Sequence, residues 1–153
     1  MTILSIDSGI EKTGYAIFKN KNYVTSALIK TSKTKTTEIR LEEIYSQLKK
    51  VIKKYSPDKI IIEQLFFYKN QKTAIKVSQT QGVALLLAGQ NKIKVDYLTP
   101  LQIKQAVTGY GQADKKSVQK MIKLTTGIDI KQDDEADAVA CGLAYNLIST
   151  NLR

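Results

Sequence analysis

The sequence predicts an α/β protein with a mixed five-stranded sheet, helices on both faces of that sheet, and its first three strands antiparallel. Three short apolar segments open the chain and are separated by tight polar turns, which is typical of antiparallel strands. Helical and strand patterns then alternate to the end, which favours a mixed sheet covered by helices. No repeat, linker or low-complexity tract divides the sequence, so residues 1–153 are expected to form a single domain.

The first half of the chain is expected to give three strands, a helix and a fourth strand. Residues 1–7, 13–18 and 23–29 are the short apolar segments, and each is predicted to be a strand. Residues 37–55 repeat apolar side chains at a helical period, with acids early and lysines late, as the helix dipole favours. Residues 59–63 read Lys-Ile-Ile-Ile-Glu, which predicts a central strand buried on both faces.

The second half is expected to add four helices and one strand. A helix is predicted at residues 71–90, where the apolar run 83–88 indicates burial either in the core or against a partner subunit. A short strand at residues 93–98 precedes Pro100. Helical periodicity then predicts the last three helices, at residues 101–108, 115–125 and 134–148.

The composition favours a nucleic-acid partner and excludes several kinds of catalysis. The formal net charge is +10, and only Arg40 and Arg153 among the 24 basic residues are arginine. Lysine suits phosphates better than base edges, although an AT-rich genome would give the same bias. Histidine is absent, which excludes histidine-based catalysis and histidine metal ligands. The single cysteine, Cys141, lies in an apolar helical run and is expected to be a small buried hydrophobe.

Four carboxylates stand at positions where acids are unusual. Asp7 and Glu63 each end an apolar strand, and Asp134 and Asp137 lie within one turn at the start of the last helix. Each alone has an ordinary explanation, because strand-end acids begin loops and helix-start acids stabilise the helix dipole. Gathered at one edge of a sheet, the four would repel one another unless divalent cations neutralised them. Oxygen ligands without histidine point to Mg²⁺, with Mn²⁺ as a substitute, and a pair of such ions suits phosphodiester hydrolysis.

Several sequence blocks carry a specific pattern of motifs over nearly the whole chain. They are residues 6–9 with 13–16, 62–66, 81–84, 103–111 after Pro100, and 134–138. In composition, order and spacing these blocks resemble the RuvC family of Holliday-junction resolvases. The resemblance implies a ribonuclease H-like fold and a metal-dependent endodeoxyribonuclease. It also implies a homodimer whose two active sites cut paired strands of a four-way DNA junction.

The resemblance implies roles for individual residues. The family's catalytic, metal-binding acids match four positions, Asp7, Glu63, Asp134 and Asp137. Its DNA-contacting residues match three positions: the backbone-holding Lys104 and Lys115, and Phe66, an aromatic that stacks on or wedges junction bases. For Phe66, packing in the core is the alternative. The short chain and sparse arginine prompt the hypothesis of a compact, phage-type member that tolerates a wider range of branched DNA, although the sequence does not decide between host and phage origin.

Three other functions stay open on the sequence alone. Residues 7–9 with 13–14 also resemble the first phosphate loop of the sugar kinase, actin and heat-shock ATPases, although those proteins need two such domains. The others are a non-catalytic DNA-binding module of the same fold and a ribonuclease H-like nuclease acting on RNA. No signal peptide or membrane span is visible, so the cytoplasm of a bacterium or of a phage-infected cell is expected.

Overall fold

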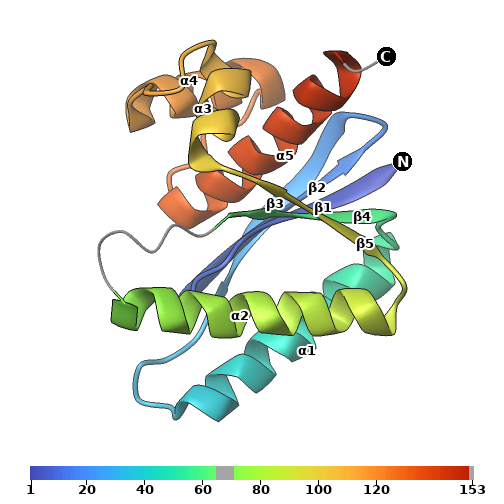
Figure 1. The fold of residues 1–153 in the computed structure, drawn as a ribbon, viewed down its shortest axis with the longest axis vertical. Helices are drawn as coiled ribbons and strands as arrows, with labels where there is room; N and C mark the ends of the chain where they lie inside the picture. The colour runs from blue at the N-terminus through green and yellow to red at the C-terminus, as the bar shows by residue number, and fades with distance from the viewer. Residues whose placement is uncertain (65–70, 152–153) are drawn as a thin grey trace.

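The structure, a computed structural model, describes residues 1–64 and 71–151 and contains a mixed sheet between two layers of helices (Figure 1). The strands are β1 (Thr2–Asp7), β2 (Lys12–Lys19), β3 (Asn22–Lys30), β4 (Lys59–Glu63) and β5 (Lys94–Leu98). The helices are α1 (Thr37–Tyr55), α2 (Gln71–Gln90), α3 (Pro100–Thr108), α4 (Lys115–Thr126) and α5 (Asp133–Asn151). These bounds confirm the predicted elements, and the largest difference is that α5 continues to Asn151.

The sheet has five strands in the order β3-β2-β1-β4-β5. β1, β2 and β3 pair antiparallel, whereas β4 pairs parallel with both β1 and β5. The predicted antiparallel opening is therefore confirmed, and β4 lies inside the sheet rather than at its edge. Its three isoleucines are fully buried, as expected for a strand that is covered on both faces.

The two faces of the sheet are covered by different helices. One core lies between the sheet and α1 with α2, and it includes Leu4, Ile6, Ile44 and Leu87. The other lies between the sheet and α3, α4 and α5, and it includes Ile3, Phe18, Ile61, Ile122 and Val139. Successive side chains of a strand point to opposite faces. The odd-numbered residues of β1 and β4 therefore point toward α5, which places both strand-end acids on that side.

Helix α5 packs unusually close to the sheet because two glycines allow it. A Cβ atom on Gly142 would overlap the ring of Phe18, and one on Gly14 in β2 would overlap the backbone of Asp134. The hydroxyl of Ser5 donates a hydrogen bond of 2.7 Å to the carbonyl of Ala138. The start of α5 is therefore fixed against the ends of β1 and β2. Cys141 is fully buried in the same helix, which confirms its predicted structural role.

Helix α2 divides its apolar residues between the core and the surface. Ala84, Leu87 and Ala88 are buried, whereas Leu85 and Leu86 are exposed. One side of this helix therefore joins the core, which is the first of the predicted alternatives, and the other side leaves two leucines exposed in the single chain. Across residues 1–64 and 71–151, no helix is long and apolar enough to cross a membrane.

Candidate active site

Asp7 and Glu63 lie side by side at the carboxyl ends of two neighbouring strands. Ile6 pairs with Ile62 in the parallel ladder of β1 and β4, so the two acids follow at the same level. Adjacent strands lie about 4.8 Å apart, and equivalent positions of a parallel pair point to the same face. The side chain of Gln81 on α2 donates a hydrogen bond of 3.0 Å to the backbone carbonyl of Glu63, which anchors this strand end.

The first turns of α5 bring Asp134 and Asp137 to the same edge. Each is half-buried, because the start of α5 rests on β1 and β2. Between them Glu135 turns toward β3, where its carboxylate accepts a hydrogen bond of 2.6 Å from Ser26. Glu135 therefore has a structural partner of its own on β3. Asp134 and Asp137 instead lie near enough to Asp7 to affect its ionisation.

The carboxylates are close enough to change one another's ionisation. Burial, and then repulsion from Glu63, Asp137 and Asp134 in that order, raises the pKa of Asp7 from 3.8 to about 8. Burial and the charge of Asp137 raise the pKa of Glu63 from 4.5 to about 7, against an opposing effect of Lys104. Burial also raises the pKa of Asp137. The structure therefore joins all four acids in one electrostatic cluster, which we call the acid cluster.

Two lysines face this cluster across a cavity of about 310 Å³. Lys104 from α3 and Lys115 from α4 line the cavity together with Glu63 and Asp137. The ammonium of Lys115 lies 3.0 Å from the carboxylate of Asp133 and 4.0 Å from that of Asp137. Although burial opposes its charge, these acids raise the pKa of Lys115. Both predicted lysines thus lie at the acid cluster.

Phe66, the third predicted DNA contact, lies outside the described residues. Asp133 is a residue that the sequence reasoning missed as a partner of Lys115. Its position at the first residue of α5 is indistinguishable in sequence from that of an acid stabilising the helix dipole. Only the approach of α4 to α5 reveals the pairing.

The donor set of the acid cluster fits a hard divalent cation. Its side-chain donors are carboxylate oxygens, which are the ligands that such a cation prefers. Their negative charges repel one another, and the pKa of Asp7 is raised to about 8 and that of Glu63 to about 7. In the arrangement described, no group of three or more acidic or sulfur side chains within residues 1–64 and 71–151 is close enough to hold one ion. One of these carboxylates, that of Asp137, lies 4.0 Å from the ammonium of Lys115. The acids share one edge, and closing on an ion requires their side chains to rotate.

Comparison with known proteins gives consistent matches along the chain. The family model described as "Crossover junction endodeoxyribonuclease RuvC" matches residues 3–145. The protein of that name from Caldicellulosiruptor saccharolyticus is 42% identical, over 99% of this chain and 96% of that protein. The one from Alkaliphilus metalliredigens is 46% identical, over 95% of this chain and 92% of that protein.

Solved structures match at the level of the whole fold. RuvC from Thermus thermophilus covers 99% of this chain and 96% of its own, with a TM-score of 0.88 and 26% identity. RuvC from the same organism in complex with Holliday junction substrate gives a TM-score of 0.90, at 26% identity over 97% of this chain and 94% of that chain. These matches confirm the ribonuclease H-like sheet that the motifs implied.

Proposed function

Because this chain belongs to the crossover junction endodeoxyribonuclease RuvC family, we propose that it resolves four-way DNA junctions by hydrolysing phosphodiester bonds on opposite strands. The observation that carries the proposal is the acid cluster, in which four carboxylates from β1, β4 and α5 lie near enough for the other three to raise the pKa of Asp7, beside two lysines. The Thermus thermophilus RuvC structure that holds a Holliday junction substrate has the same fold over nearly the whole chain. The alternative ATPase and the non-catalytic module are not favoured, because the family match is to junction endonucleases.

We assign the catalytic role to Asp7, Glu63, Asp134 and Asp137 as ligands of Mg²⁺, with two ions in each site and Mn²⁺ as a substitute. Metal dependence is typical of this family, and bound divalent ions would supply an activated water and stabilise the leaving oxygen. The contribution of the chain is to hold the four carboxylates on rigid elements. Two of them sit at strand ends and two on a helix fixed to the sheet, which limits the freedom of the site.

The raised pKa values of Asp7 and Glu63 give the acid cluster its own proton chemistry. With pKa values of about 8 and about 7, these two carboxyl groups retain much of their protons near neutral pH in the metal-free protein. Carboxylates must lose their protons to bind a cation, so metal binding would release protons. Lys104 and Lys115 offer positive charge at the same cavity and would bind the phosphates of the DNA strand being cut.

The proposal includes a homodimer, which places two acid clusters on one junction. The exposed leucines of α2 support it, because adjoining apolar side chains at a surface mark contact sites. Phe66 is proposed to stack on junction bases from its position just after β4. We place the activity in the cytoplasm of a bacterium or of a phage-infected cell, where such DNA junctions form.

The test is cleavage of synthetic four-way, three-way and linear DNA in the presence of Mg²⁺. Wild type should cut the four-way junction into paired nicked products, and Glu63→Gln should bind the junction with unchanged affinity but fail to cut it. Glu42→Gln, an exposed acid on α1, is the matched control and should cut normally. Cutting by Glu63→Gln at the wild-type rate would contradict the assignment. Nucleotide hydrolysis without junction cutting would favour the ATPase alternative.

A further inference from the structure

A second cavity, of about 570 Å³, adjoins the acid cluster. It is lined by the turn after β1, the loop between β3 and α1, and the first turns of α1 and α2, and we call it the basic groove. Four separate segments contribute its cationic side chains, Lys12, Lys33, Arg40 and Lys76. Asp134 also lines it, so the basic groove and the acid cluster share a residue.

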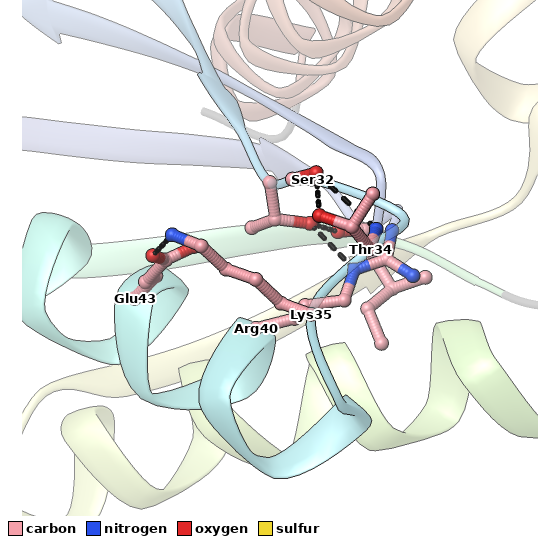
Figure 2. Close-up of polar contacts among 7 residues, drawn as sticks. Ser32, Thr34, Lys35, Arg40 and Glu43 are labelled. Carbon is pink, nitrogen blue, oxygen red and sulfur yellow. Dashed lines mark hydrogen bonds and ion pairs between the residues drawn. The ribbon is translucent and has the colours of Figure 1, made fainter.

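Arg40 is the unusual member of the basic groove. Its side chain is only 8% exposed, although arginine is almost never buried without a partner. Its Nε donates a hydrogen bond of 2.8 Å to the hydroxyl of Thr31, which in turn donates one of 2.5 Å to the carbonyl of Ile10. Figure 2 shows Arg40 reaching from α1 toward the loop that carries Ser32 and Thr34. No carboxylate among the described residues forms an ion pair with it.

This arrangement uses little of the guanidinium. Arginine carries five N–H donors, and the bond to Thr31 uses one of them. Within the described part of the chain, Ser8 Oγ is the only side-chain nitrogen or oxygen atom that is both sealed from solvent and without a hydrogen bond. The terminal nitrogens of Arg40, which have no hydrogen bond to a described residue, are therefore not sealed from solvent. Because Arg40 lines the groove, these nitrogens are open to it. A hydrogen bond to Thr31 that served only the fold would not require a charged side chain at position 40. The remaining donors, held in a fixed fork, are suited to an oxyanion.

The rest of the groove favours an anion as well. Among the described residues that line the groove, Glu11 is the one acid besides Asp134, and its carboxylate lies 3.1 Å from the ammonium of Lys33. That pair is widely exposed and therefore weak. Lys12 and Lys76 add two further positive charges, and neither forms an ion pair with a described acid. The groove thus has an excess of positive charge that no described acid neutralises.

We propose that the basic groove binds the phosphodiester backbone of DNA, with the guanidinium of Arg40 holding one phosphate. This rests on the proposed function, since it concerns the DNA entering the same acid cluster. Lys104 and Lys115 lie on the α3 and α4 side of the sheet, whereas the groove lies beside α1 and α2 (Figure 1). The backbone would therefore be held on both sides of the acids.

The test measures DNA binding by fluorescence anisotropy, without divalent ions, over a series of salt concentrations. The variants are the double substitution Lys12→Gln/Lys76→Gln and the single substitution Arg40→Lys. The control is Lys50→Gln/Lys53→Gln, which removes the same charge from exposed positions on α1 outside the groove. Loss of two phosphate contacts should lower the slope of log Kd against log salt by about 1.8 and weaken binding by about tenfold or more at low salt. The control should keep the wild-type slope.

Two results would overturn the proposal: a groove double variant with wild-type slope and affinity, or a control that weakens equally. Arg40→Lys keeps the charge but loses the fork, so it should bind more weakly than wild type at an unchanged melting temperature. If Arg40→Lys does not fold, the lysine double variant decides alone. Binding to linear duplex tests the groove independently of cutting. If the wild-type protein binds duplex DNA through the groove but does not cut junctions, the proposed function is refuted and the proposal about the groove is retained.

Discussion

Replacing Asp7 with asparagine should stabilise the metal-free protein, and increasingly so as the pH rises. The pKa of this carboxyl group is raised from 3.8 to about 8 by burial and by its acidic neighbours. Well below pH 3.8 the group is protonated whether the chain is folded or unfolded, so it has no effect on the free energy of unfolding. Between pH 4 and pH 8 the unfolded chain releases the proton and the folded chain retains it. Stability is therefore lost as the pH rises through this window.

The size of the effect follows from the separation of the two pKa values. Each unit corresponds to about 1.4 kcal/mol, so Asp7 costs about 5 kcal/mol at pH 8 and about 2 kcal/mol at pH 5. Asparagine has the shape of the protonated acid but does not ionise. The gain in free energy of unfolding for Asp7→Asn should therefore be about 3 kcal/mol larger at pH 8 than at pH 5.

Urea unfolding of both proteins at the two pH values, with a chelator present, measures this difference. Asp129→Asn is the matched control, because it removes an exposed acid whose carboxylate lies 3.6 Å from Lys123 and should change stability by less than about 1 kcal/mol. Excess Mg²⁺ should stabilise wild type more than Asp7→Asn, since the cation neutralises the carboxylate. Equal pH dependence of the two proteins, or a variant less stable than wild type at pH 8, would refute the electrostatic reasoning.

Three further predictions concern packing and contacts. Gly14→Ala places a methyl group where the backbone of α5 begins, so it should lower both the melting temperature and junction cutting, whereas Gly82→Ala meets no neighbour and should do neither. Leu86→Glu, on the exposed side of α2, should shift the protein to a monomer in analytical ultracentrifugation, while Leu124→Glu, at a still more exposed position on α4, should not. Phe66→Ala should keep the melting temperature and reduce junction cutting, and a parallel loss of both would assign the ring to the core.

The fold could be predicted from sequence because its determinants are local. Apolar alternation and period define each strand and helix, and the consecutive isoleucines of β4 indicate a strand buried on both faces. The acids could be singled out for a similar reason, since Asp7 and Glu63 each end such a strand. Their convergence follows from the parallel pairing of β1 with β4, a contact between distant segments that the local patterns do not specify.

The groove and the ion pairs could not be predicted, because they depend on contacts between distant segments. Arg40 reads in sequence as an ordinary helix residue, and its burial arises only when the loop before α1 folds over the turn after β1. The link between Lys115 and Asp133 depends in the same way on how α4 meets α5. Propensity and period carry no information about such tertiary contacts.

The close packing of α5 against the sheet also limits the positions at which residues can be inserted. Asp134 and Asp137 precede Gly142 on one continuous helix, and Gly142 is the point that fits against Phe18. One residue inserted between Asp137 and Gly142 would turn both acids by about 100° around the helix axis, away from the strand ends. Insertions in the loop before Asp133 would leave that orientation intact. Length variation among active homologues, and designed insertions that preserve cutting, should therefore avoid this interval of α5.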